Sequence, residues 1–246
     1  MIRRVFAETW GLWLLLAGWQ AWVSLAGYNA IVMPRPADVF GDLAAAPGAY
    51  LGPTATTLAT AALGLAGGLL LGCGLAVLAY ASRLLDGLLT PLGLVFSSIP
   101  VVCLIPVLAR LFGYDQRTVL AAVVVITFFP AFVFAGAGLR ATPPMSEALF
   151  AVLGARGWVR LVRLALPSAV PNTMIAFRVT AAQSILAAMV AEFLMGTGGL
   201  GQMLAASRAD FQMSRAIGAS LVAMALSTVV YVATAAIERR VRARWR

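Results

Sequence analysis

The 246-residue chain contains no histidine, and all 18 of its basic residues are arginine, so lysine is absent as well. Without lysine the chain cannot build the phosphate-binding loop in which a lysine contacts the β- and γ-phosphates of ATP. Without histidine it has no histidine general base, no Ser-His-Asp triad and no histidine metal site. We therefore expect no enzyme, no catalytic residues, no metal site and no cofactor bound by this chain itself.

Charge is also scarce. Charged residues make up 11% of the chain, against roughly 25% in an ordinary soluble domain, whereas the hydrophobic set reaches 62%. A water-soluble fold of this size could not bury that much apolar surface. The composition predicts an integral membrane protein, and the net charge of +9 is interpreted as a topology signal rather than as a nucleic-acid surface.

Six segments are apolar and long enough, or nearly so, to cross a bilayer as helices of about 20 residues. They are residues 10–28, 54–81, 87–112, 118–139, 173–195 and 216–237. We expect an all-α polytopic membrane protein with a single transmembrane domain over residues 1–246. The first segment follows two arginines and could be a signal peptide, but its apolar stretch is long for one, so a retained anchor is expected.

Small residues in these segments predict close helix packing, and prolines predict helix breaks. Gly64, Gly68 and Gly72 recur at a spacing that lets two membrane helices approach closely. Prolines are expected to interrupt the third span, at Ile99-Pro100 and at Pro106, and the fourth span, at Pro130. Broken helices at membrane depth are tolerated where they line a cavity or pack within protein, so these breaks are candidate elements of a solute path.

Arginine placement gives the orientation, because cytoplasmic loops are enriched in basic residues. With the N-terminus in the cytoplasm, the inner group is Arg3, Arg4, Arg83, Arg140, Arg156, Arg160, Arg163, Arg239, Arg240, Arg242, Arg244 and Arg246. The outer group is the smaller set Arg35, Arg110, Arg117, Arg208 and Arg215. Both termini are therefore expected in the cytoplasm, which agrees with an even number of spans.

The longest cytoplasmic loop, residues 140–171, contains the most informative pattern. Gly154 permits a sharp turn, and Pro167 is expected to end the helix predicted over Ala155–Leu166. That helix would place apolar residues on one face and arginines on the other; they are Trp158, Leu161 and Val162, and Arg156, Arg160 and Arg163. A short helix bracketed by turns suits a docked cytoplasmic partner, although an amphipathic helix lying on lipid headgroups is the alternative.

At this loop the chain resembles a known family. Gly154, nine residues, then Leu164-Ala165-Leu166-Pro167 is similar to the signature loop of bacterial ABC importer permeases, Glu-Ala-Ala-x3-Gly-x9-Ile-x-Leu-Pro. The pair Glu147-Ala148 stands one residue earlier than in that pattern.

Three further stretches resemble the nitrate/sulfonate/taurine subfamily, in order along nearly the whole chain. They are Met33-Pro34-Arg35-Pro36 with Val39, then Ile99-Pro100 through Pro106 to Leu111-Phe112-Gly113, then Ala191-Glu192 followed by Gly198-Gly199-Leu200-Gly201.

The resemblance implies the type I fold of ABC importer permeases, with a coupling helix that docks on ATP-binding subunits. The coupling residues it implies, together with the loop pattern, are Glu147, Gly154, Ala155, Arg156, Trp158, Arg160, Leu164, Leu166 and Pro167. It also implies a second permease copy, two ATP-binding subunits that carry ATP and Mg, and a periplasmic or lipid-anchored substrate-binding protein. The expected location is the bacterial inner membrane, and the expected cargo is a small solute such as a sulfonate, nitrate, taurine, bicarbonate or a vitamin precursor.

Polar residues inside the spans are candidates for the path or gate: Ser97, Ser98, Pro100 with its helix break, Gln183, Ser184 and Glu192. Glu192 stands out because an ionisable residue at membrane depth is costly and usually functional. A gating role, a structural hydrogen bond and a position at the membrane interface all remain open for it, as do hydrogen bonds between helices for the other polar residues.

A secondary transporter or channel that works without ATP is the competing class, and a scaffold without transport is a third. A secondary transporter often carries intramembrane carboxylates and two related halves, whereas this sequence offers one such glutamate and no evident repeat.

Overall fold

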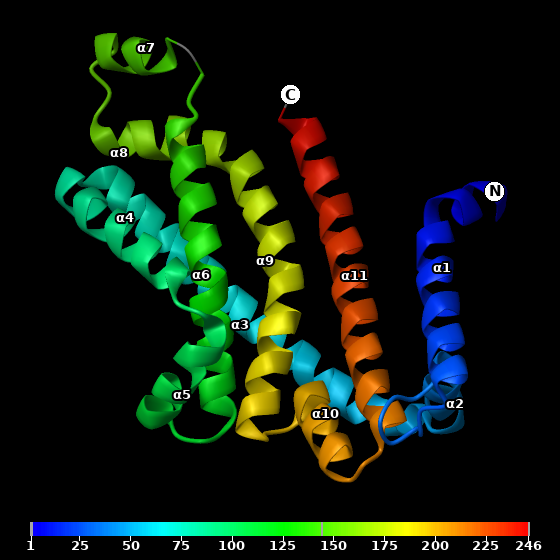
Figure 1. Cartoon of the computed structure of the whole chain (residues 1–246). Coiled ribbons are helices and arrows are strands. Elements are labelled where there is room, and N and C mark those ends of the chain that lie inside the picture. The colour runs from blue at the N-terminus through cyan, green and yellow to red at the C-terminus, as the bar shows by residue number, and fades with distance from the viewer. Residues whose placement is uncertain (1, 144, 246) are drawn as a thin grey trace.

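The computed structural model describes residues 2–143 and 145–245, with the side chains of residues 2–9, 12, 94, 96 and 97 left out, and this part of the chain is all-helical (Figure 1). The four elements that are long and apolar enough to cross a membrane are α3 (Pro47–Ala81), α6 (Gln116–Arg140), α9 (Leu166–Met195) with the helical turns before it, and α11 (Met213–Arg244). The other elements are α1 (Ile2–Ala26), α2 (Pro36–Ala45), α4 (Arg83–Ser98), α5 (Val101–Phe112), α7 (Ser146–Val152), α8 (Gly157–Arg160), a π-helical turn η1 (Leu161–Ala165) and α10 (Gly199–Ala209).

The centre of the molecule is the packing of α3 and α9 against α6. A Cβ atom at Gly64 would collide with Val123, at Gly68 with Thr127, and at Gly72 with the backbone of α6. Because glycine has no side chain, the two backbones come into direct contact, and the close approach predicted from the glycine spacing is confirmed.

The third predicted span is two helices rather than one. The chain breaks between Ser98 and Val101, where Pro100 caps α5, as the sequence predicts. Pro106 and Pro130 were expected to interrupt their helices too, and those predictions were wrong, since α5 and α6 continue through them. A single proline removes one backbone hydrogen bond, which packed membrane helices tolerate.

The remaining helices extend beyond the predicted apolar segments. α3 begins at Pro47 instead of residue 54, α9 at Leu166 instead of residue 173, and α11 continues to Arg244 instead of residue 237. Hydropathy marks the apolar part of a helix, whereas its polar ends remain helical in water or headgroups.

The short helices gather at the two ends of the bundle (Figure 1). Both ends of the chain lie on the same side as α7 and α8, whereas α2 and α10 lie on the opposite side. The helix α10 lies between the long helices α9 and α11 in the sequence, and it packs against α9, α11 and α3.

Candidate functional site

The segment α7–α8 projects from the bundle on a turn that only glycine makes easily. Gly154 has φ = 65°, in the left-handed region, and a Cβ there would meet nothing within 4 Å. The amide of Ala155 donates to the carbonyl of Phe150 at 3.0 Å, which closes the C-terminal end of α7. The turn predicted at Gly154 is therefore confirmed, and its cause is backbone conformation rather than crowding.

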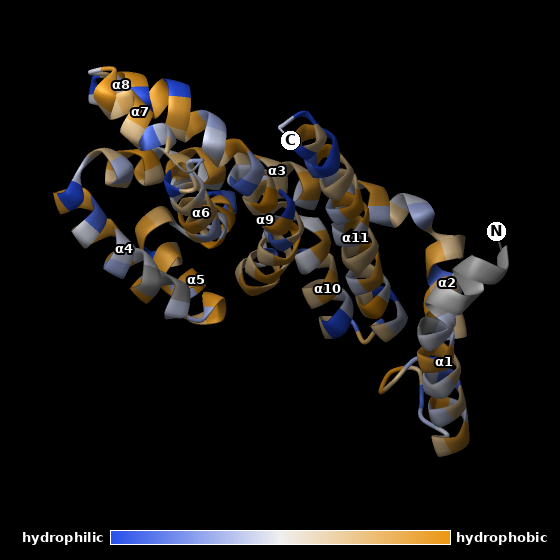
Figure 2. Cartoon of the chain, turned by 90° about the horizontal axis from the view of Figure 1, so that it is seen from above, coloured by the Kyte–Doolittle hydropathy of each residue, from blue (hydrophilic) through white to orange (hydrophobic). Residues whose placement is uncertain are grey.

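Large apolar side chains on this segment are exposed, although α7 lies outside the four long apolar helices and α8 is only the first turn of the third of them. The exposed fractions are 57% for Leu149, 86% for Val152, 70% for Leu153 and 72% for Trp158. In Figure 2 hydrophobic and hydrophilic residues alternate along α7 and α8. Clustered exposed apolar residues mark a surface that a partner covers.

The C-terminal half of the predicted Ala155–Leu166 helix anchors the projection. Leu161 and Ala165 are buried in a cluster with Ala76 and Leu139, and Leu164 is buried as well. Trp158 and Leu161, which were predicted to share an apolar face, therefore have different environments: Trp158 points outward and Leu161 packs into the core.

Pro167 was expected to end this helix, and that prediction was wrong. Helical structure runs from Gly157 through η1 and α9 to Met195, with Pro167 in the first turn of α9, where a proline costs least. The change of direction between α8 and α9 occurs over the π-helical turn (Figure 1). Leu166 is 38% exposed, at the start of α9.

Glu147 lies in the first turn of α7 and approaches Arg160 of α8. Its Oε2 is 3.6 Å from Arg160 Nη2, and its Oε1 accepts a hydrogen bond of 3.4 Å from Thr142. A hollow of about 430 Å³ opens beside Arg160 and Trp158, and Tyr80 and Ala81 of α3 line its other wall. Ala155 is half-buried and Arg156 is exposed. Of the coupling residues predicted from sequence, Leu164, Leu166 and Pro167 lie where the projection joins the bundle, and the others lie in the projection: Glu147, Gly154, Ala155, Arg156, Trp158 and Arg160.

At the other end of the bundle, Glu192 is fully buried in α9 and bound to two other elements. Its Oε2 accepts a hydrogen bond from the Thr57 hydroxyl of α3 at 2.8 Å and another from the Gly201 amide of α10 at 3.1 Å. Thr57 in turn accepts from the Leu200 amide at 2.8 Å. We call Thr57, Glu192, Leu200 and Gly201 the outer knot, since they tie α3, α9 and α10 together.

Glycines make the outer knot possible. A Cβ at Gly199, where φ is 80°, would collide with the Glu192 carboxyl group, and a Cβ at Gly201 would collide with the α9 backbone at Met189. The spacing Ala191-Glu192…Gly199-Leu200-Gly201 therefore has a physical meaning: the glycines let α10 lie directly on the carboxylate.

The other path candidates do not gather around Glu192. Pro100 is exposed at the break before α5, and Ser98 is exposed at the end of α4. The Ser97 side chain lies outside the described residues. Gln183 is exposed, whereas Ser184 is buried and donates to the carbonyl of Ala181 at 2.9 Å.

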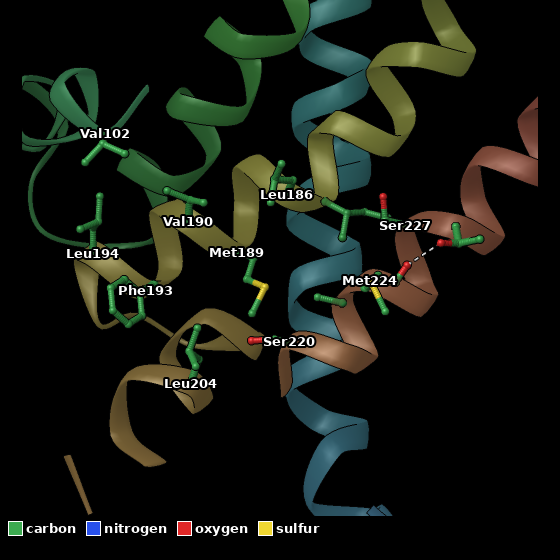
Figure 3. A pocket seen from close by; sticks show the side chains of 13 residues that line it. Val102, Leu186, Met189, Val190, Phe193, Leu194, Leu204, Ser220, Met224 and Ser227 are labelled. Carbon is green, nitrogen blue, oxygen red and sulfur yellow. Dashed lines mark hydrogen bonds between the residues drawn. The ribbon is translucent and has the colours of Figure 1, made fainter. Parts of the chain in front are cut away.

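The structure has a groove of about 610 Å³, which we call the α9–α11 groove (Figure 3). Most of its lining comes from α9 and α11, with Leu204 from α10 and Val102 from α5. The sequence gives no signal for the groove, because its apolar lining has the composition of any lipid-facing helix surface.

Two ion-pair clusters were also missed. Glu238 of α11 is 4% exposed, with Arg178 Nη1 at 2.8 Å and Arg242 Nε at 3.2 Å. Arg178 therefore joins α9 to α11. The Arg178–Glu238 pair is far apart in sequence and leaves no spacing pattern, whereas Arg242 follows Glu238 by four residues on the same helix.

The second missed cluster lies at the end of the bundle opposite α7 and α8, where Asp42 of α2 accepts hydrogen bonds from the Tyr50 hydroxyl at 2.6 Å and from Arg215 Nη2 at 3.0 Å. Burial raises the pKa of the Asp42 carboxyl, but these hydrogen bonds and the Arg215 charge outweigh it and hold the pKa below its ordinary value of 3.8. Among the described residues, no group of three or more Cys, Asp or Glu could hold a metal ion.

Comparison with protein families gives one match, and it spans most of the chain. The model for "Binding-protein-dependent transport system inner membrane component" matches residues 68–243. This range includes the α7–α8 projection, Glu192 and the whole α9–α11 groove.

Three curated proteins illustrate the relatives. The chain is 33% identical over 145 residues to "Formylaminopyrimidine transport permease protein ThiX" of Halalkalibacterium halodurans, covering 59% of this chain and 58% of that protein. It is 30% identical over 236 residues to "Riboflavin transport system permease protein RibX" of Chloroflexus aurantiacus, covering 95% and 88%. It is 24% identical over 216 residues to "Putative aliphatic sulfonates transport permease protein SsuC" of Bacillus subtilis, covering 87% and 78%.

Solved structures share the fold. A chain of the inward-facing MetNI methionine ABC transporter superposes with a TM-score of 0.66 at 20% identity, covering 76% of this chain and 93% of that one. A chain of an amino acid ABC transporter with histidines also gives a TM-score of 0.66, at 15% identity, with coverages of 76% and 92%. At these identities the likeness describes the fold alone.

Proposed function

We propose how this chain works from one premise: it belongs to the family of inner membrane components of binding-protein-dependent transport systems. It is the transmembrane permease of an ABC importer for a small solute, and ATP hydrolysis resides in partner ATP-binding subunits. The family decides against a secondary transporter, a channel or a scaffold. ATP and Mg accordingly belong to the partner subunits.

The proposed topology has six crossings in one domain over residues 1–246, with both termini in the cytoplasm. Four crossings are the long helices, and α1 supplies another. α4 and α5 are each shorter than the roughly 20 residues that a span needs, so we propose that they cross together with the break at Pro100 between them. The positions of both chain ends beside α7 and α8 and the arginine distribution support this orientation in the bacterial inner membrane.

A second copy of the chain is proposed as the partner within the membrane. α1 stands apart from the bundle in Figure 1, and it packs mainly against α2. Leu14, Leu15, Trp22 and Leu25 of this helix are all more than half exposed. An apolar helix that its own chain leaves uncovered suits packing against a second permease.

Two ATP-binding subunits are proposed to dock on the α7–α8 projection, and a periplasmic or lipid-anchored binding protein is proposed to deliver solute to the opposite end. ATP binding would then push the projection and rock the bundle between inward- and outward-facing states. The solute class is proposed from the named relatives, which transport formylaminopyrimidine, riboflavin and aliphatic sulfonates, alongside nitrate, taurine and bicarbonate from the subfamily resemblance.

One observation carries the docking proposal: large apolar side chains are exposed on α7, which lies outside the long apolar helices, and Trp158 is 72% exposed beside them, at the start of the helical run that continues to Met195. The test is co-purification of the permease with its ATP-binding subunit. Trp158→Asp should abolish co-purification, because it places a charge in the contact.

The matched control is Trp245→Asp, which alters an exposed tryptophan near the same end of the molecule but outside the projection. It should leave co-purification intact. If Trp158→Asp inserted normally and still co-purified at the wild-type level, the docking site would lie elsewhere.

A further inference from the structure

The α9–α11 groove has the size of a small-molecule site, since such sites measure about 300–1,000 Å³. Figure 3 shows Met189, Phe193 and Leu204 grouped at one part of its wall and Met224 and Ser227 at another. One aromatic ring and two thioethers offer a flat, polarisable surface to a ring-shaped solute. Val102 reaches the groove from the first turn of α5, directly after the break at Pro100.

None of the thirteen residues that line the groove is charged. Arg208 approaches Phe193, with its guanidinium carbon 5.8 Å from the ring centroid, but it lines a separate hollow toward Phe211. Glu192, next to Phe193 in sequence, turns its carboxyl group toward Thr57 and Gly201 instead. An anion that entered the groove would lose its hydration without gaining a counter-charge.

The polar groups of the groove are three hydroxyls, and each already donates its hydrogen to a backbone carbonyl. Ser220 donates to the carbonyl of Ala216 at 3.3 Å, Ser227 to that of Ala182 at 3.2 Å, and Thr228 to that of Met224 at 2.8 Å. Each oxygen keeps lone pairs, so the three hydroxyls can accept hydrogen bonds from a bound solute. A solute with N–H or O–H donors satisfies them, whereas a sulfonate, which only accepts, does not.

Val102, which lines the groove, belongs to the first turn of α5, where a helix leaves backbone amides without intrahelical acceptors. A single helix start without a basic side chain compensates only part of the desolvation of a sulfonate. The groove therefore favours an uncharged solute with hydrogen-bond donors over an anionic solute.

We infer that the α9–α11 groove is a substrate station of this importer and that it selects an uncharged, flat heterocycle bearing N–H donors, of the aminopyrimidine or flavin kind, against sulfonate-like anions. The inference rests on the proposed function and narrows its solute class. The juxtaposition that carries it is an uncharged groove to which α9 contributes Phe193 and Met189, while α11 contributes Met224 and three hydroxyls whose hydrogens bond to backbone carbonyls.

The test measures equilibrium binding to the permease with its ATP-binding subunits in lipid nanodiscs, without the binding protein. Riboflavin is the probe, followed by fluorescence polarisation, and formylaminopyrimidine and ethanesulfonate, an anion without N–H or O–H donors, are the competitors. We expect formylaminopyrimidine to displace riboflavin and ethanesulfonate to have no effect at the same concentration.

The variant is Ser220→Ala combined with Thr228→Val, which removes two acceptors at nearly constant shape. Binding should weaken on the order of tenfold, because each hydrogen bond contributes about 0.5–1.5 kcal/mol. The matched control is Thr234→Val on the same helix, where the hydroxyl makes the same kind of bond, to the carbonyl of Val230 at 2.7 Å, outside the groove. The control should bind riboflavin as the wild type does.

Displacement by ethanesulfonate but not by formylaminopyrimidine would overturn the inference, and so would a groove that retains only phospholipid and binds neither probe. ATP-driven uptake by the same assembly in proteoliposomes, with its binding protein added, tests the proposed function separately from the inference. Uptake of ethanesulfonate alone would support the importer and refute the inference, whereas the absence of ATP-driven uptake of every small solute proposed above would refute the proposed function and the inference with it.

Discussion

The two ends of this bundle are built in opposite ways. At the outer end, buried polar groups from helices far apart in sequence are bonded to one another, through Glu192 in the outer knot and through Asp42 with Tyr50 and Arg215. At the end that carries α7 and α8, exposed apolar side chains have no cover within the described chain, and Glu147 and Arg160 face each other across 3.6 Å at the surface. One end is stabilised by its own buried hydrogen bonds, whereas the other exposes an apolar surface that suits a partner.

The largest effect should come from breaking the outer knot. Glu192→Ala leaves the Thr57 hydroxyl and the Gly201 amide buried without an acceptor. It should lower the free energy of unfolding by about 2–4 kcal/mol, because a buried donor without a partner costs about 1–3 kcal/mol. Denaturant unfolding of the purified permease in detergent measures this loss.

The matched control for the outer knot is Glu192→Gln, which keeps an acceptor oxygen in place and should retain most of the stability. It also separates structure from mechanism: if Glu192→Gln imports solute at the wild-type rate, the carboxylate has no gating role. If Glu192→Ala is as stable as the wild type, the knot does not hold α10 in place.

The Asp42 cluster should give the next largest effect. Asp42→Asn removes the counter-charge of Arg215 and should destabilise the permease by about 1–2 kcal/mol at pH 7, since the group is partly exposed. Asp210→Asn changes an exposed carboxylate just beyond α10 and should have no measurable effect.

Acid should weaken the same cluster. The folded-state pKa of Asp42 lies below its ordinary value of 3.8, so the unfolded chain takes up the proton first as the pH falls. The stabilisation is complete above about pH 5 and is lost as the pH falls through the folded-state pKa. The wild type and Asp42→Asn should therefore converge in stability on acidification, and a constant difference down to pH 3 would contradict the assignment.

A smaller effect is expected at the turn of the projection. Gly154→Ala meets no neighbouring atom, so its cost is the left-handed backbone alone, roughly 1–2 kcal/mol. Shifting the projection should weaken the affinity for the ATP-binding subunits by about fivefold or more, as measured by titration in nanodiscs. Gly157→Ala also has open space, at a position without a positive φ, and should bind normally. Equal affinities for the two variants would show that the turn does not position the docking surface.

The smallest effect on stability is expected at the ion pair of the projection. Glu147→Gln should change the free energy of unfolding by less than about 0.5 kcal/mol, because both partners are partly exposed and 3.6 Å apart. The affinity for the ATP-binding subunits, measured in the same titration, shows whether Glu147 also touches the partner. An intact affinity would remove Glu147 from the coupling residues.

The sequence predicted best what depends on local chemistry. The glycine spacing on α3, the turn at Gly154 and the break at Pro100 follow from backbone geometry, which a few neighbouring residues determine. It could not predict that Pro167 would lie within a continuous helix, because the π-helical turn before it depends on the burial of Leu161 and Leu164 against distant helices.

Contacts between segments far apart in the chain could not be predicted from the sequence either. The Glu192 partners Thr57 and Gly201, and the triad of Asp42, Tyr50 and Arg215, are joined only by the fold. Glu192 itself was found because its charge is unusual in an apolar span, whereas the α9–α11 groove is lined by residues that are ordinary there.

The central claim is that ATP hydrolysis on partner subunits drives solute through this chain by way of the α7–α8 projection. The most direct measurement compares ATP hydrolysis and solute uptake in the same proteoliposomes for the wild type and Gly154→Pro, in which the left-handed turn cannot form. The account predicts ATP-driven uptake by the wild type, and for the variant an inserted permease whose assembly hydrolyses ATP without uptake. Uptake by Gly154→Pro at the wild-type ratio of solute to ATP would contradict it.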